Sequence, residues 1–103
     1  MMEPEAVREG SHWTFLTNHA HVLLCLARDP LARLRDVAIE VGITERATQR
    51  IVADLADGGY ISRTRVGRRN QYELHPELHL RHPIEHMKTV GELLELIEPR
   101  LQD

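Results

Sequence analysis

The stretch that decides the fold runs from residue 34 to residue 74 and reads LRDVAIEVGITERATQRIVADLADGGYISRTRVGRRNQYEL. Its first apolar residues recur with the i, i+3, i+4, i+7 spacing of one helix face, and they are Leu34, Val37, Ala38 and Val41. Gly42 follows this face directly, and glycine readily adopts the left-handed backbone conformation found just past a helix end. The pattern therefore predicts a short helix that ends at Gly42.

A second helix is predicted to follow almost at once. Thr44 is a favourable N-cap because its hydroxyl can accept a hydrogen bond from a backbone N–H of the first turn. The apolar face of this helix comprises Ala47, Ile51 and Leu55. We expect the hydroxyl of Thr48, which lies beside this face, to donate to the carbonyl of Thr44. The sequence Asp57-Gly58-Gly59 ends the helix.

Two short strands around a glycine-containing turn are predicted for the rest of this stretch. Tyr60-Ile61 opens the first strand, and residues 71–74 alternate polar and apolar side chains as a half-buried strand does. Residues 66–70 are predicted to form the turn, and Asn70 takes part because asparagine tolerates turn dihedral angles. The residues expected to hold the hairpin on the body are Ile61, Tyr72 and Leu74.

Helices are also predicted on both sides of this stretch. Before it, a helix starts at Thr17 or Asn18 and ends near Asp29-Pro30, because the residue before a proline disfavours helical dihedral angles. After it, His82-Pro83 marks the start of a helix that runs to about Glu98, since proline suits the first turn. The predicted organisation is a loose N-terminal tail (1–12), one domain of helices and a hairpin (13–79) and a C-terminal helix (80–103).

Length and composition limit the class of protein. A chain of 103 residues has room for one domain with a single core. Its one cysteine excludes an internal disulfide and an all-cysteine zinc site. No apolar run is long enough to span a bilayer, and the first nine residues lack the apolar segment of a signal peptide. The expected location is therefore the cytoplasm, with no membrane partner.

Charge is distributed unevenly along the chain. The formal net charge is −3, yet residues 60–72 carry four arginines and no acidic residue. A local cationic segment on an acidic body can bind a polyanion while the body stays soluble. Charge alone favours a nucleic-acid partner and a merely solvated hairpin equally.

The order and spacing of these features resemble the winged helix-turn-helix of small prokaryotic transcriptional regulators, in particular the MarR-like and ArsR-like groups. The resemblance covers about residues 14–75, with the small residue Ala38 where the two helices cross and Gly42 in the turn. The segments that carry it are Leu34–Ala38, Val41–Arg46, Ile51–Leu55, Gly59–Ile61 and Gly67–Leu74. Thr48 departs from the pattern, because an aliphatic residue is usual at this position. The resemblance implies a mainly α fold with a small β-hairpin and a protein that binds double-stranded DNA sequence-specifically.

The resemblance also implies which residues would contact DNA. Residues 44–57 would form the recognition helix in the major groove, and residues 61–74 the wing on an adjacent groove or the backbone. The side chains expected to point outward from the recognition helix are Arg46, Gln49, Arg50 and Ala53. Arginine and glutamine suit the edges of guanine and adenine, whereas Thr44 at the helix start suits a phosphate. The wing residues expected to reach DNA are Arg65, Arg68, Arg69 and Asn70.

Four histidines fall within twelve residues, and they are His75, His79, His82 and His86. His82 and His86 are spaced i, i+4 and could share a metal ion, and ArsR-like proteins include metal sensors. The match of residues 82–86 to an H-x-x-E-H pattern is short and lacks a third ligand. We therefore predict no metal site and no cofactor, with DNA binding unchanged by chelation. Cys25 is predicted to be a small buried apolar side chain rather than a redox sensor.

An apolar stripe on the predicted C-terminal helix indicates a contact surface. It consists of Met87, Val90, Leu94, Ile97 and Leu101, spaced like the seam of a short coiled coil. The stripe could hold a homodimer or cover the first helix of its own chain. We favour the homodimer, because operators for regulators of this kind are usually two-fold and a second copy doubles the contacts.

These observations predict a dimeric winged-helix transcriptional regulator. It is not expected to be an enzyme, because no nucleophile–base pair or phosphate-binding loop is evident. One alternative is a protein-interaction module, which a neutral or acidic outer face on residues 44–57 would favour. The other is a metal-responsive ArsR-like repressor, which would contain metal after purification. No ligand-binding domain is recognisable, so no small-molecule effector is assigned.

Overall fold

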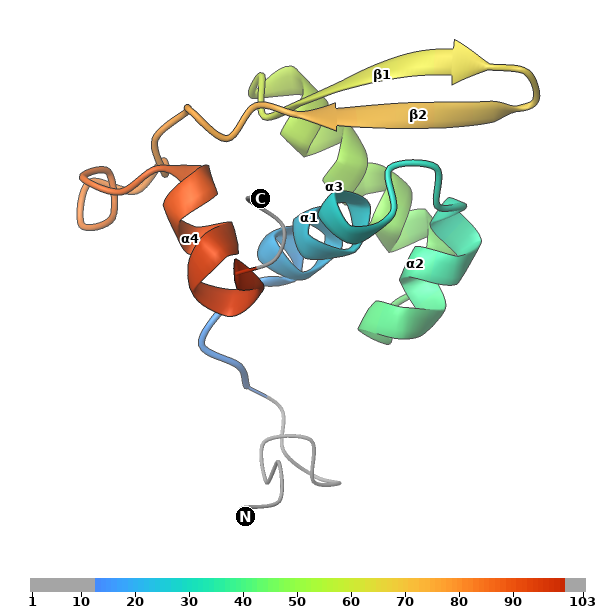
Figure 1. Ribbon diagram of the computed structural model, residues 1–103. Helices are drawn as coiled ribbons and strands as arrows, with labels where there is room; N and C mark the ends of the chain where they lie inside the picture. Colours follow the sequence, from blue (N-terminus) through green and yellow to red (C-terminus); the bar gives the residue numbers. More distant parts are fainter. Residues whose placement is uncertain (1–12, 100–103) are drawn as a thin grey trace.

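The computed structural model describes residues 13–99 and shows a mainly helical α+β fold with one hairpin (Figure 1). Its elements are α1 (Asn18–Arg28), α2 (Leu34–Val41), α3 (Glu45–Asp57), β1 (Ile61–Val66), β2 (Arg69–Leu74) and α4 (Val90–Ile97). The predicted fold class and order of elements are confirmed. None of the helices within these residues is long and apolar enough to cross a membrane. The predicted tail at 1–12 lies outside the described residues.

The helix-turn-helix formed by α2 and α3 has the local hydrogen bonds that the sequence predicts. Gly42 ends α2 with a positive φ of 89°, and the carbonyl of Ala38 accepts from the N–H of Gly42 at 2.8 Å and of Ile43 at 3.0 Å. The Thr44 hydroxyl caps α3 by accepting from the N–H of Ala47 at 3.0 Å. The Thr48 hydroxyl donates to the carbonyl of Thr44 at 3.0 Å, which confirms the expected bond.

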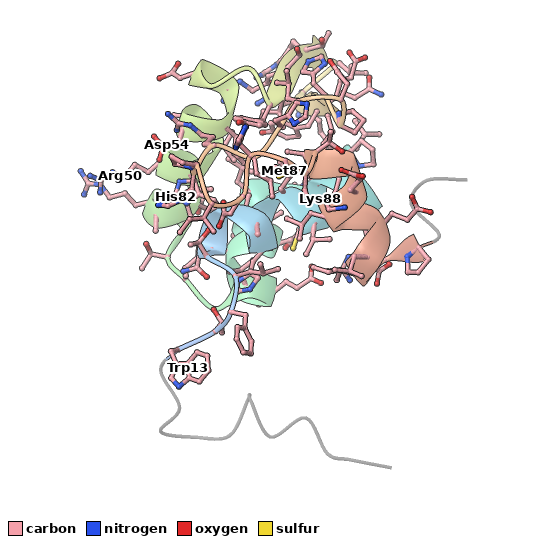
Figure 2. The ribbon with its side chains drawn as sticks, turned by 90° about the vertical axis from the view of Figure 1, so that its left-hand side faces the viewer. Trp13, Arg50, Asp54, His82, Met87 and Lys88 are labelled. Atoms are coloured by element: carbon pink, nitrogen blue, oxygen red, sulfur yellow. The ribbon has the colours of Figure 1, made fainter. Side chains whose placement is uncertain are left out.

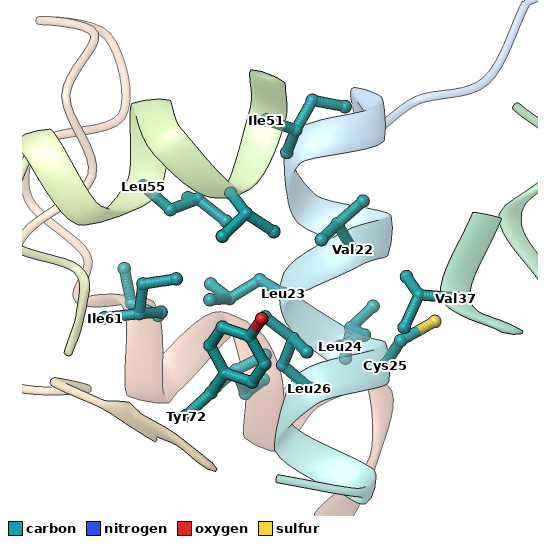
Figure 3. Packing of buried hydrophobic residues seen from close by; sticks show 13 residues of the cluster. Val22, Leu23, Leu24, Cys25, Leu26, Val37, Ile51, Leu55, Ile61 and Tyr72 are labelled. Carbon is teal, nitrogen blue, oxygen red and sulfur yellow. The ribbon is translucent and has the colours of Figure 1, made fainter. Parts of the chain in front are cut away.

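The core is built around α1, whose residues Val22 to Leu26 are all buried. Figure 3 shows their side chains between Ile51 and Leu55 of α3 and Val37 of α2. The buried face of α3 is displaced from the predicted one, because Thr48 and Val52 are fully buried whereas Ala47 is only half-buried. The reason is that α3 packs against both α1 and α2, which buries a wider face than a single neighbour would.

The wing differs from the prediction in the length of its turn. Val66 pairs with Arg69, so the turn is only Gly67-Arg68, and Asn70 is a strand residue that pairs with Arg65. Gly67 has a φ of 62° and no other residue of the described chain except Gly42 and Gly59 has a positive φ. This is the pattern of a type II′ turn, which places glycine at its first central position and fits the twist of paired strands. The prediction that Asn70 makes the turn was therefore wrong.

The predicted start of the C-terminal helix at His82-Pro83 was also wrong. Residues 80–88 form turns and loop, and α4 begins only at Val90. The start is fixed by a capping box in which Thr89 Oγ1 accepts from the N–H of Glu92 and the Glu92 carboxylate accepts from the N–H of Thr89. The same backbone bond lowers the pKa of Glu92, so the carboxylate is ionised and accepting at neutral pH. A proline permits a helix start, whereas a complete capping box stabilises one.

Candidate nucleic-acid interface

The outward face of α3 carries the four side chains that the sequence predicts to point outward. Arg46, Gln49, Arg50 and Ala53 are all exposed. Figure 2 shows Arg50 projecting from the body on the side opposite α4. Because the buried face of α3 is fixed by Thr48, Ile51, Val52 and Leu55, the outward direction of these four side chains follows from the helical repeat.

A groove of about 370 Å³ joins this face of α3 to the wing and to the start of α2. We call it the basic groove. Its lining comprises Ala32, Arg33, Leu34, Glu45, Gln49, Arg68, Arg69, Asn70 and Tyr72. Three arginines and one carboxylate therefore surround a concave surface at the first turn of α3, a distribution that favours an anionic ligand.

Arg33 lines this groove, although the sequence pattern did not point to it. It is exposed and is the residue that immediately precedes α2. Its place before a predicted helix start was visible in the sequence. The sequence does not show that Arg33 lies near Arg68 and Arg69, because this proximity depends on how the wing folds over the α1–α2 loop.

The wing is anchored to the body by two hydrogen bonds to the α1–α2 loop. The N–H of Tyr72 donates to the carbonyl of Pro30 at 2.9 Å, and Arg69 Nη1 donates to the carbonyl of Leu31 at 3.1 Å. Arg65 Nε donates to the carbonyl of Gly67 within the turn at 3.2 Å. Arg69 thus has a structural contact in addition to its predicted role, whereas Arg68 lies in the exposed turn. The burial of Ile61 and Tyr72 confirms that they pack on the body.

One carboxylate near the outward face of α3 is paired with a side chain of α1. Asp54 Oδ2 lies 2.9 Å from Nε2 of His19, and both side chains are about half exposed. Asp54 follows Arg50 by one helical turn, and the two residues lie near each other in Figure 2. This contact pairs the Asp54 carboxylate with an imidazole of α1.

The four side chains of the histidine-rich segment have hydrogen-bond partners, three within the segment and one in β1. His79 Nδ1 lies 2.7 Å from the carbonyl of His86, and His86 Nδ1 lies 3.0 Å from the carbonyl of Pro83. His82 Nδ1 accepts from the N–H of Ile84 at 3.1 Å, and His75 Nε2 lies 2.6 Å from the hydroxyl of Ser62. Within residues 13–99, no group of three or more histidine, cysteine, aspartate or glutamate side chains is placed to hold a metal ion.

Cys25 is buried on α1, as the sequence predicts. Burial raises the pKa of its thiol, and the nearby Glu40 carboxylate raises the pKa further. Glu40 in turn pairs with Arg28 at 3.0 Å. A thiol with a raised pKa is mostly protonated at neutral pH and therefore a poor nucleophile.

The apolar stripe assigned to a dimer seam is divided by the structure. Val90 and Leu94 are each only 2% exposed and belong to the core of their own chain, so they cannot also form a seam with a second copy. Met87 and Ile97 are exposed, and Leu101 lies outside the described residues. The predicted seam is therefore wrong at Val90 and Leu94. The short helix α4 packs its apolar side on its own chain, and heptad spacing is the same for such a helix as for a coiled-coil seam.

No protein-family model matches the chain, and no curated protein matches it. The support for the candidate interface is therefore its geometry alone, in which three arginines surround a groove at the exposed face of α3.

Proposed function

We propose that this protein is a sequence-specific regulator of transcription that binds double-stranded DNA, similar to the MarR-like and ArsR-like winged-helix proteins and acting in the cytoplasm. The observation that carries the proposal is the basic groove, which Gln49 of α3 lines and which lies beside a helix face that also exposes Arg46 and Arg50. A neutral or acidic face on α3 would have favoured a protein-interaction module instead. The proposal requires no metal and no other cofactor.

The two parts of the interface have different tasks in this proposal. The exposed face of α3 enters the major groove, where Gln49 and the two arginines offer donors to base edges. Arg33 and Arg68 line the basic groove, and they neutralise phosphates and fix the register of the helix. A dimer would place two such helices on one duplex about 34 Å apart, or a multiple of that distance.

A selection from a pool of random duplexes tests the proposal. We expect enrichment of one sequence motif, and we expect that motif to bind at least 10³-fold more tightly than random duplex at physiological salt. A chain that binds no duplex even at low salt, or that enriches no motif, would contradict the proposal.

The wing arginines are expected to supply mainly electrostatic affinity. Replacing Arg65, Arg68 and Arg69 together by alanine should flatten the slope of log affinity against log salt, by about 0.9 for each phosphate that the variant no longer neutralises. Arg69→Ala alone should cost more affinity than Arg68→Ala alone, because it also removes the bond to the Leu31 carbonyl that anchors the wing. Fluorescence anisotropy with a labelled duplex at several salt concentrations measures both effects.

The matched control is Lys88→Ala, since Figure 2 places Lys88 beside α4 on the side away from Arg50. It removes one exposed positive charge and should leave the slope unchanged. A triple wing variant with the native slope would show that the wing stays off the DNA.

A further inference from the structure

A second groove, of about 460 Å³, lies along the edge of β2 that faces away from β1. We call it the edge groove. Its lining comprises Leu26, Ala27, Pro30, Thr64, Gln71, Tyr72, Glu73, Leu74, Pro76 and Leu94. Most of these residues are apolar, and they come from α1, the hairpin, α4 and the loops at Pro30 and Pro76. The volume lies within the range of about 300–1,000 Å³ that is typical of ligand pockets.

The backbone of β2 also faces this groove. The N–H of Tyr72 donates outward to Pro30 rather than to β1, and backbone groups of alternate residues along a strand point the same way. The carbonyl of Tyr72 and the N–H and carbonyl of Leu74 therefore point away from β1, toward the edge groove. The loop at Pro30 occupies this edge at Tyr72, so an extended peptide could pair with β2 only at the end of the strand near Leu74, and it would place alternate side chains in the groove.

The chain itself carries a segment of this kind. Residues 13–17, which we call the arm, precede α1 and include Trp13 and Phe15, which are 68% and 91% exposed. Their rings contact only edge to face, with centroids 5.2 Å apart. In an extended arm these two side chains would lie on the same face, as the groove requires. Docking would replace the bends at Phe15 and Leu16 by extended backbone.

The arm leaves α1 at the end opposite to the edge groove of its own chain. The groove contacts Leu26 and Ala27 in the last turn of α1, whereas the arm leaves from the first turn, and these residues lie eight and nine positions after Asn18, about 12–14 Å along the helix. Phe15 lies three residues before α1, so even a fully extended chain carries it at most about 11 Å. Figure 1 shows the arm leaving the body on the side away from the hairpin.

We propose that the arm of one copy docks in the edge groove of a second copy, so that two copies exchange arms around a two-fold axis. Burial of a tryptophan or phenylalanine removes about 150–250 Å² from water, so four rings and the groove surfaces that cover them bury about 1,200–2,000 Å². That is the area of a stable, specific interface. Because each copy gives one arm and receives one arm, the exchange uses every arm and groove in a dimer, and no larger assembly forms. This inference goes beyond the proposed DNA binding and does not rest on it.

Trp13 is the only tryptophan of the chain, and its fluorescence reports directly on docking. As the concentration of the full chain rises from nanomolar to tens of micromolar, we expect its emission to move to shorter wavelength. The midpoint should coincide with the monomer–dimer transition measured by sedimentation, with no DNA present. Ala27→Glu places a charge in the groove, and Phe15→Ala removes an anchor from an arm outside the core. Each should weaken dimerisation at least tenfold, and circular dichroism checks that both variants fold.

The control is Ile39→Ala, which removes an exposed apolar side chain of α2 outside both the arm and the groove. It should dimerise like the native chain. A dimer whose Trp13 emits as a solvated indole would overturn the inference and point to another surface, such as Leu96 and Ile97 of α4. A monomer at tens of micromolar would overturn it too, whether its Trp13 is shielded, as docking within one chain requires, or solvated.

Discussion

Replacing Leu94 by glutamate is expected to unfold the protein rather than to give a folded monomer. Leu94 is 2% exposed and lies in the core formed with α1 and the hairpin. Loss of a buried leucine side chain costs about 2–5 kcal/mol, and an unpaired buried carboxylate adds several kcal/mol more. A domain of this size is stable by about 5–15 kcal/mol. Far-ultraviolet circular dichroism and urea denaturation would measure the loss.

Leu96→Glu is the matched control, because Leu96 lies on the same helix but is 79% exposed. It should keep the native spectrum and a urea midpoint close to that of the native chain. A Leu94→Glu variant that is folded, with native stability, would mean that α4 does not pack on its own chain. The apolar stripe would then be available as a seam between copies.

Loss of the two central polar side chains of α3 is expected to abolish discrimination between DNA sequences. Gln49→Ala and Arg50→Ala should each cost about 1–3 kcal/mol on the selected duplex, which is the value of a good bidentate base contact. Both side chains are exposed and make no contribution to the core, so the fold should be unaffected. Binding to random duplex should change much less, because phosphate contacts dominate it.

Anisotropy titrations with the selected and the random duplex, side by side, separate these two effects. Glu95→Gln, on the exposed side of α4, is the control and should change neither affinity. Equal losses of affinity for both duplexes would contradict base readout by α3. They would mean that α3 contributes only electrostatic affinity.

The sequence predicted the helix-turn-helix well because its signals are local. The positive φ of Gly42, the Thr44 cap and the Thr48 bond each involve residues at most four positions apart. The outward direction of Arg46, Gln49 and Arg50 follows from one helical repeat once the buried side is known.

The errors arose where the outcome depends on contacts between distant segments. Val90 and Leu94 have the spacing of a coiled-coil seam, and only the packing of α4 on the body shows that they are core residues. The basic groove depends on the bond from Arg69 to Leu31, between residues 38 positions apart. The late start of α4 is a different case, since Thr89 and Glu92 form a capping-box pattern that the sequence displays. A proline such as Pro83 suits the first turn of a helix but does not by itself start one.

Amide chemical shifts of the protein, followed by NMR as the selected duplex is added, test the central claim most directly, because each residue reports separately. We expect the largest changes at residues 44–53, at residues 65–70 of the wing and at Arg33, which line or flank the basic groove. We expect little change along α4, on the opposite side from Arg50 (Figure 2). Changes confined to α4 and the loop at residues 80–88, with α3 and the wing unaffected, would contradict the account.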